Sequence, residues 1–289
     1  MPDSQDLPKQ FPPQHQDFHP GFEYLMEPRP ISEDPNYRGS GKLKGKVAII
    51  TGGDSGIGRA VAYAFVKEGA TVVIVYLNEH RDAMETKVRI EQLGGRSLFL
   101  AADITSEDNC RWIIDETIRR YGQIDILVNN AAVQYVAEGP EEISTEQWMR
   151  TFAVNIFAPF FLTKAALPHL QRGASIINTD SIVAYRGQEK LLDYSSSKGA
   201  LRVFTYTLSL QLVDRGIRVN GVAPGPIWTP LIPSSFSAEE VAKFGREVPY
   251  KRAGQPFELA PAYVYLASDD STYVSGQMIH VNGGAIVNG

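Results

Sequence analysis

The stretch VAIITGGDSGIG, residues 47–58, decides how the rest of the chain is interpreted. Residues 47–51 are a short apolar run typical of a buried parallel strand, and residues 57–68 are predicted to form a helix. Glycines between them let the backbone turn tightly and approach a pyrophosphate, and the free N–H groups at the helix N-terminus favour its negative charge. A glycine loop alone can be only a turn, but between a strand and a helix it predicts a dinucleotide site. The predicted cofactor-binding residues of this loop are Gly52, Asp54, Ser55, Gly56, Ile57 and Gly58.

Strand and helix patterns alternate from residue 44 onward. The further predicted strands are 71–76, 97–101, 126–128, 175–179, 218–222 and 278–281. The further predicted helices are 81–93, 107–121, a long stretch within 145–170, 194–214 and 258–267. Such alternation, with right-handed crossovers, predicts an α/β fold: a doubly wound, parallel, seven-stranded Rossmann sheet. Residues 44–289 are therefore expected to form one Rossmann-type domain.

Residues 1–43 have a different composition, with many prolines that exclude a helix or a central strand. The segment is either a disordered tail or an extended arm lying on a folded surface. Disordered tails are poor in aromatic residues, whereas this one contains Phe11, Phe18, Phe22 and Tyr24, which favours the arm. His15 and His19 have no partner at ligand spacing, so no metal site is expected.

Composition and charge exclude several classes of function. The net charge of −5 gives no basic field for a nucleic-acid backbone. No apolar run approaches the roughly 18–20 residues that span a bilayer, and the N-terminus lacks the layout of a signal peptide. The single cysteine, Cys110, rules out an internal disulfide and is expected to be a helix residue. We therefore expect a cytoplasmic protein that binds neither membrane nor nucleic acid.

The ends of the second and third strands carry the signals for the adenosine half of the cofactor. An acidic residue at the end of the second strand would favour NAD and an arginine NADP. The stretch there is YLNE, which is Tyr76, Leu77, Asn78 and Glu79, with neither signal at the expected place. Because no basic residue is present, NAD is favoured, with NADP as the alternative. Asp103, followed by Ile104, is placed to accept from the adenine amino group. Its alternative role is to cap the next helix.

Tyr194 and Lys198 lie four residues apart, on one face of a predicted helix. The pKa of a free tyrosine is about 10. A nearby ammonium and the positive ring of an oxidised nicotinamide favour the phenolate and so lower this pKa, which would let Tyr194 exchange a proton. Such a pair is weak evidence by itself. It gains weight because Ser181 follows the preceding strand and could hold a substrate oxygen.

Taken together, these motifs resemble the short-chain dehydrogenase/reductase family over residues ~44–289. The Pro-rich leader, the loop TGGDSGIG and the ending VNGG at 281–284 resemble a bacterial subgroup of largely uncharacterised oxidoreductases, some described as aldehyde reductases or general stress proteins. The matching pieces are residues 51–58, Asp103, NNAA at 129–132, Asn155, Ser181, Tyr194, Lys198 and PGPIWT at 224–229. The usual N-N-A-G is N-N-A-A here, ending at Ala132, from which we expect little effect.

The resemblance implies hydride transfer between NAD or NADP and a small or medium carbonyl or alcohol. It implies that Tyr194 is the general acid/base, that Lys198 lowers its pKa and binds the nicotinamide ribose, and that Ser181 orients the substrate oxygen. Asn155 would kink the long fourth helix and hold a water of the proton relay. Asp180, just before Ser181, departs from the usual small neutral residue and leaves the charge of the substrate in doubt.

Other positions are assigned by the same resemblance. Asn130 and Ala131 would flank the adenine ribose, and Asn129 would brace the sheet. A loop over the nicotinamide would contribute Pro224, Gly225, Ile227 and Thr229. The candidate substrate walls are Gln134, Tyr135, Val183, Gln188 and the segment 228–250. That segment is either a lid over the substrate or simply apolar packing.

The resemblance also implies a homotetramer, in which we expect the N-terminal arm to lie across a neighbouring subunit. The alternative function is a catalytically silent dinucleotide-sensing or scaffolding protein on the same fold. Such proteins typically lose the tyrosine or the lysine, and this chain has both. An epimerase or dehydratase would need an extended substrate domain that the core length does not provide.

Overall fold

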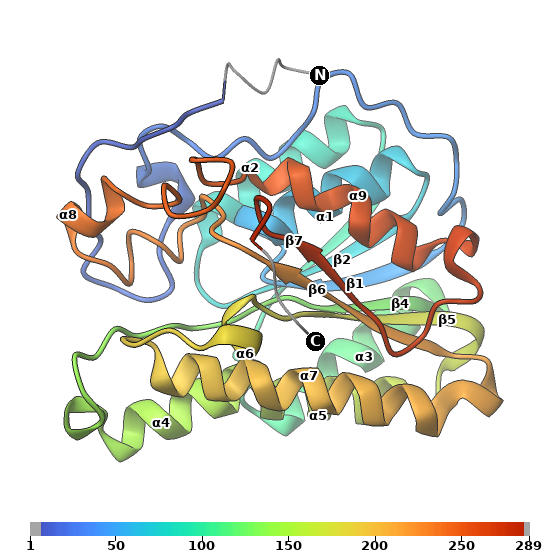
Figure 1. Cartoon of the computed structure of the whole chain (residues 1–289). Coiled ribbons are helices and arrows are strands. Elements are labelled where there is room, and N and C mark those ends of the chain that lie inside the picture. The colour runs from blue at the N-terminus through green and yellow to red at the C-terminus, as the bar shows by residue number, and fades with distance from the viewer. Residues whose placement is uncertain (1–6, 286–289) are drawn as a thin grey trace.

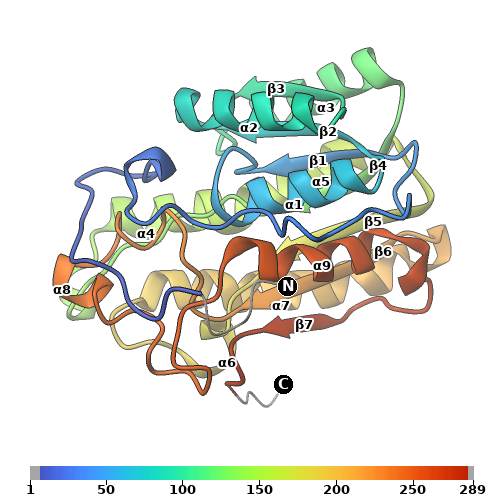
Figure 2. The ribbon, with the colours of Figure 1, turned by 90° about the horizontal axis from the view of Figure 1, so that it is seen from above.

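The structure, a computed structural model, describes residues 7–285 and contains one parallel sheet of seven strands (Figures 1 and 2). The order across the sheet is β3-β2-β1-β4-β5-β6-β7. The strands are β1 (Val47–Thr51), β2 (Thr71–Tyr76), β3 (Ser97–Ala101), β4 (Ile124–Asn129), β5 (Leu170–Thr179), β6 (Arg218–Pro224) and β7 (Met278–Val281). The predicted doubly wound Rossmann sheet is confirmed.

Helices cover both faces of the sheet (Figure 1). One face carries α1 (Gly56–Lys67), α2 (His80–Gln92) and α9 (Pro256–Ala267), and the other carries α3 (Glu107–Tyr121), α5 (Ala158–Ala166) and α7 (Leu192–Leu212). Every residue of β1 is buried, as expected for a central strand that is apolar on both faces. The strand order reverses between β1 and β4, so the crevice at their carboxyl ends is the expected ligand site.

The long helical stretch predicted within 145–170 is interrupted. It consists of α4 (Thr145–Phe152), a π-helical turn η3 (Ala153–Phe157) and α5, after which β5 begins at Leu170. Asn155 lies in the π turn, where a kink was expected. Two short helices were not predicted, α6 (Val183–Arg186) and α8 (Ala238–Val241). The remaining turns are η1 (Glu23–Leu25), η2 (Pro140–Glu142), η4 (Val213–Arg215) and η5 (Asp269–Ser271).

The described part of the N-terminal segment, residues 7–43, runs as an extended arm over its own chain (Figures 1 and 2). Leu7, Phe11 and Met26 are buried, and the ring of Phe11 stacks on that of Trp228 at a centroid distance of 3.8 Å. These residues therefore lie on a folded surface, as in the second of the two alternatives. Residues 1–6, and residues 286–289 of the predicted domain, lie outside the described residues.

Membrane-spanning helices, metal-ligand clusters and the single cysteine can each be examined in the described part of the chain. Within residues 7–285, no helix is both long and apolar enough to cross a membrane, and no group of three or more His, Cys, Asp or Glu side chains could hold a metal ion. Cys110 is a buried residue of α3, as expected.

Candidate active site

A cavity of about 610 Å³ lies at the carboxyl ends of the strands. It is bounded by the glycine loop, the ends of β2, β4, β5 and β6, the segment after β6, and part of the arm. Most of the predicted site residues line it. They are Gly52, Asp54, Ser55, Gly56, Ile57, Tyr76, Leu77, Asp103, Ile104, Asn130, Ala131, Ser181, Tyr194, Lys198, Pro224, Gly225, Ile227 and Thr229. Gly58, Asn78 and Asn155 do not line it.

The glycine loop has the backbone geometry that a phosphate cradle needs. Gly52 has a φ of 62°, and its N–H donates to Val75 O at 2.7 Å. A Cβ at Gly58 would lie 2.0 Å from Gly52 O, so only glycine allows α1 to approach the loop this closely. Gly58 therefore acts through packing, which explains why it lies outside the cavity wall.

The N-terminus of α1 is anchored by a carboxylate from the arm, which sequence reasoning missed. Glu23 Oε2 accepts from Gly56 N at 2.6 Å, and Glu23 Oε1 pairs with Arg59 Nη1 at 2.5 Å. Asp82 Oδ2 accepts from Glu23 N at 2.7 Å. All three charged side chains are buried. An acidic residue in a Pro-rich leader gives no sequence signal for this contact, which joins positions far apart in the chain.

The end of β2 carries the acidic group of Glu79, which the sequence argument had placed beyond the expected position. Glu79 lines the cavity, because its carboxylate folds back to accept from Leu77 N at 3.0 Å and Asn78 N at 2.8 Å. Asp54, from the glycine loop, is buried, and burial together with the charge of Glu79 raises its pKa to about 8. Two carboxyl groups therefore face the region where the adenosine ribose is expected.

Asp103 and the asparagines after β4 shape the floor of the cavity. Asp103 Oδ1 accepts from Thr105 N at 3.0 Å and Oδ2 pairs with Arg150 Nη1 at 3.1 Å, while Ser106 caps α3. The alternative role of Asp103 as the helix cap is therefore wrong. Asn129 Nδ2 donates to Asn178 Oδ1 across the sheet at 2.9 Å and braces it, as expected.

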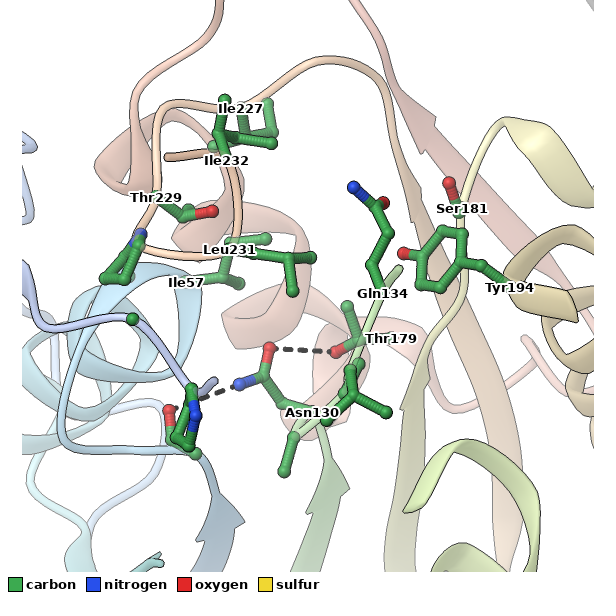
Figure 3. A pocket seen from close by; sticks show the side chains of 18 of the residues that line it. Ile57, Asn130, Gln134, Thr179, Ser181, Tyr194, Ile227, Thr229, Leu231 and Ile232 are labelled. Carbon is green, nitrogen blue, oxygen red and sulfur yellow. Dashed lines mark hydrogen bonds between the residues drawn. The ribbon is translucent and has the colours of Figure 1, made fainter. Parts of the chain in front are cut away.

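Asn130 ties together the ends of three strands. Its Nδ2 donates to Thr51 O at 3.0 Å, and its Oδ1 accepts from Thr179 Oγ1 at 3.2 Å, a contact drawn in Figure 3. These bonds use the side-chain amide within the protein. The cavity floor is consequently a rigid part of the sheet.

Ser181, Tyr194 and Lys198 gather on one wall of the cavity, and Figure 3 shows Ser181 beside Tyr194. Tyr194 and Lys198 come from α7 and are buried, and Ser181 follows β5. Lys198 Nζ donates to Thr179 O at 2.7 Å and lies 5.6 Å from the centre of the Tyr194 ring. Three of the four side chains predicted to be catalytic are thus brought together, and the fourth, Asn155, lies outside the cavity wall.

Burial is the largest influence on the pKa values of Tyr194 and Lys198. It raises the pKa of Tyr194 above its ordinary value, opposed by a hydrogen bond with Ser181 and reinforced by the charge of Asp180. Burial also lowers the pKa of Lys198 to about 8, and Asp180 opposes that shift. The sequence argument expected the ammonium and the ring of an oxidised nicotinamide to lower the pKa of Tyr194; in the structure, desolvation of the phenolate is the largest influence and raises it. Tyr194 is therefore a protonated phenol at neutral pH.

Asp180 is itself an unusual group. Only 2% of it is exposed, and neither carboxylate oxygen has a hydrogen-bond partner among the described residues. Burial raises its pKa to about 7, and the charges of Lys198 and Arg202 oppose the rise. Burial thus favours the neutral carboxyl form of Asp180, and the charge of Lys198 favours the ionised form.

Asn155 acts at the back of this wall. Its Oδ1 accepts from Val133 N at 2.9 Å, and its Nδ2 donates to Val133 O and to Ser197 Oγ, both at 3.0 Å. Ser197 Oγ in turn donates to Tyr194 O at 2.7 Å. The side chain thus joins the π turn to α7. The part in a proton relay that the resemblance implies for Asn155 stays a prediction.

The segment 228–250 both packs and lines the cavity. Trp228 is fully buried away from the cavity, against Phe11, and its Nε1 donates to Pro28 O at 2.8 Å. Other residues of the segment form the cavity wall: Thr229, Pro230, Leu231, Ile232, Phe236, Glu240, Lys243, Phe244 and Glu247. The arm completes this side with His19, Pro20 and Gly21, which sequence reasoning missed.

Comparison with known proteins places this site in context. A family model described as "Enoyl-(Acyl carrier protein) reductase" matches residues 52–285. An uncharacterised oxidoreductase of Bacillus subtilis is 60% identical, covering 97% of this chain and 98% of its own. A glucose and ribitol dehydrogenase of Daucus carota is 55% identical, covering 97% and 98%. An NADPH-dependent aldehyde reductase of Arabidopsis thaliana is 51% identical, covering 95% and 98%.

Among solved structures, a short chain dehydrogenase from Burkholderia cenocepacia in complex with NADP superposes with a TM-score of 0.79 at 29% identity. The match covers 84% of this chain and 98% of that one. Relatives of similar length therefore match nearly the whole chain, whereas this structural neighbour leaves part of it uncovered.

Proposed function

The chain belongs to the short-chain dehydrogenase/reductase family, and on that premise we propose how its own residues carry out the reaction. It is an oxidoreductase of CH–OH or C=O groups that uses a nicotinamide cofactor. We propose that it transfers a hydride between this cofactor and a small or medium carbonyl or alcohol. The observation that carries the proposal is the grouping of Ser181, Tyr194 and Lys198 on one wall of the cavity.

The residues of the cavity fit a dinucleotide. The left-handed turn at Gly52 and the close approach at Gly58 form a cradle that a Cβ would fill, next to the N-terminus of α1. Gly52, Ser55 and Ile57 would hold the pyrophosphate end, and Lys198 and Thr229 the nicotinamide end. When bound, the nicotinamide supplies or accepts the hydride.

The chain's own groups handle the oxygen and the proton. In the reductive direction Ser181 Oγ holds the carbonyl oxygen, and the protonated phenol of Tyr194 donates its proton to that oxygen. The Lys198 ammonium favours the phenolate that remains. In the oxidative direction the same groups act in reverse. Asn155, through Ser197, fixes the first turns of α7, on which Tyr194 and Lys198 lie.

For the cofactor we propose a preference for NAD over NADP. The support is local: the carboxyl groups of Asp54 and Glu79 line the end of the cavity beside β2, where a carboxyl oxygen can accept a hydrogen bond from a ribose 2′-hydroxyl. One relative is named as NADPH-dependent and one structural neighbour holds NADP, so the preference depends on these two side chains. The kcat/KM for NAD⁺ should exceed that for NADP⁺, and Glu79→Gln should narrow the ratio. A wild type that favours NADP⁺ would contradict the preference.

The test of the function itself is a panel of aldehydes, ketones and alcohols assayed with NADH, NADPH and their oxidised forms. Turnover of carbonyls or alcohols with one cofactor pair supports the proposal. Dinucleotide binding without turnover of any member would instead favour the silent sensing protein. The panel also gives the direction and the range of substrates in one experiment.

We also propose that the protein is a homotetramer. Large apolar side chains remain exposed along α5 and α7, among them Phe160 at 48% and Leu210 at 77%. Burying such side chains between subunits would remove apolar surface from water. Light scattering after size exclusion tests this, and a monomer would contradict it. A contact from the arm to a neighbouring subunit stays a prediction, because its buried side chains contact its own chain.

A further inference from the structure

Gln134 is a polar side chain in the cavity that the proposed chemistry does not use. It follows β4, and Figure 3 shows its amide pointing into the same space as Ser181 and Tyr194. Only 4% of the residue is exposed, and its Nε2 has no hydrogen-bond partner in the described part of the chain. A buried amide without a hydrogen-bond partner is unfavourable, and a bound molecule that pairs with it would be stabilised.

The direction of the Gln134 side chain is fixed by the backbone on either side of it. Val133, immediately before, is held at both its N–H and its carbonyl by Asn155. The Gln134 carbonyl accepts from Ser235 Oγ at 3.1 Å, which ties this residue to the segment over the cavity. Hydrogen bonds on both sides thus hold the backbone that directs the Gln134 amide into the cavity.

The surroundings make a hydrogen bond from Gln134 selective. The same cavity has apolar side chains in its wall, among them Ile182, Val183, Leu191, Ile232 and Phe236. A substrate that leaves a buried polar group unpaired is rejected more strongly than one that lacks an apolar contact. The amide is neutral and offers both a donor and an acceptor, which matches a hydroxyl group.

We propose that Gln134 is a specificity-determining residue that hydrogen-bonds a hydroxyl on the carbon next to the reacting carbon. The preferred substrates are then α-hydroxy aldehydes and ketones, and vicinal diols in the oxidative direction. This inference rests on the proposed function, because Ser181 and Tyr194 fix the position of the reacting oxygen and Gln134 lies beside them. The carbonyl carbon gains a hydride from the reduced cofactor, its oxygen gains the Tyr194 proton, and Gln134 forms no covalent bond.

The test compares lactaldehyde with propanal, which differ by one hydroxyl group at the relevant carbon. In the wild type, kcat/KM for lactaldehyde should exceed that for propanal by about tenfold or more, the effect of a hydrogen bond worth ~1.4 kcal/mol. Gln134→Met keeps the length of the side chain and removes the amide. It should lower the lactaldehyde value by about that factor and leave the propanal value within about threefold.

Controls keep the outcome decisive. Gln92→Leu, at the exposed end of α2 and outside the cavity, should leave the ratio unchanged. Cofactor binding and thermal melting establish that the Gln134→Met protein folds, and Gln134→Leu serves as the second variant if it does not. An unchanged ratio in the folded variant, or an equal loss for both substrates, would overturn the inference. A wild type that reduces neither aldehyde, nor any other carbonyl, with either cofactor would overturn the proposed function as well.

Discussion

The two sides of the cavity are built differently. The wall with Ser181, Tyr194 and Lys198 belongs to β5 and α7, parts of the sheet and of a 21-residue helix. The opposite side consists of the segment 228–250 and the arm, which hold each other through contacts between distant parts of the chain (Figure 2). Gln16 N, for example, donates to Pro233 O at 2.8 Å. The side chains proposed for the chemistry thus lie beside β5 and on α7, which we call the framework side. The groups that enclose the substrate lie on the segment 228–250 and the arm, which we call the docked side.

The largest effect should come from the framework side. Lys198→Met removes the ammonium that favours the Tyr194 phenolate, and we expect kcat/KM to fall by about 10²–10⁴-fold, the range for lost acid–base assistance. Lys164→Met is a matched control, since Lys164 is exposed, lies outside the cavity and forms a salt bridge with Glu107. Steady-state kinetics on the best carbonyl measure both. A decrease in kcat/KM smaller than tenfold would contradict this assignment, because the reaction would then not depend on Lys198.

A smaller effect, of another kind, should come from the docked side. Phe11→Ala removes the ring that stacks on the buried Trp228. Truncating a phenylalanine in a protein core costs about 3–5 kcal/mol of folding free energy. Here we expect the lost packing to loosen the arm and the segment 228–250, which should raise KM by about tenfold or more while kcat changes less. Kinetics and thermal melting measure it.

Phe18→Ala is the control for this variant, since Phe18 lies on the same arm and is 38% exposed. It should change KM and stability little. If Phe11→Ala instead lowered kcat as strongly as Lys198→Met does, the idea that the docked side affects substrate binding and the framework side the chemical step would be wrong.

The smallest effect concerns pH. Burial lowers the pKa of Lys198 and the Asp180 charge opposes this, so Asp180→Asn should lower the Lys198 pKa further. The ammonium is lost as pH rises through that pKa. The alkaline limb of the reductive kcat/KM, near pH 8 in the wild type, should therefore move to lower pH, by about one unit or less. Asp214→Asn, at an exposed position, should not move it. A limb that stays in place or moves to higher pH would contradict the coupling.

The residues of the framework side could be predicted from the sequence, because the sequence patterns that identify them are local. The glycine spacing at 51–58 and the four-residue interval from Tyr194 to Lys198 each follow from the geometry of one turn or one helix. The ends of β1, β2, β3 and β7 were predicted to the residue for the same reason, since apolar runs bounded by turns define them.

The docked side was not predictable in the same way. Glu23 reaches Gly56 and Arg59, and Trp228 reaches Pro28, only after the fold has brought segments up to 200 residues apart together. The carboxylate of Glu79 reaches the end of β2 by folding back along its own turn, so counting residues from the strand missed it. Asp180 was noticed as unusual, but its burial and its coupling to Lys198 depend on packing.

The central claim is that Tyr194 transfers the proton while the rest of the cavity holds the cofactor. Tyr194→Phe keeps the ring that packs against Ile182 and Leu191 and removes only the hydroxyl. The most direct measurement is NADH binding by fluorescence titration together with turnover of the best carbonyl, on wild type and variant. We predict a dissociation constant within about threefold of the wild type and a turnover reduced by at least about 10²-fold. Turnover close to that of the wild type would contradict the account.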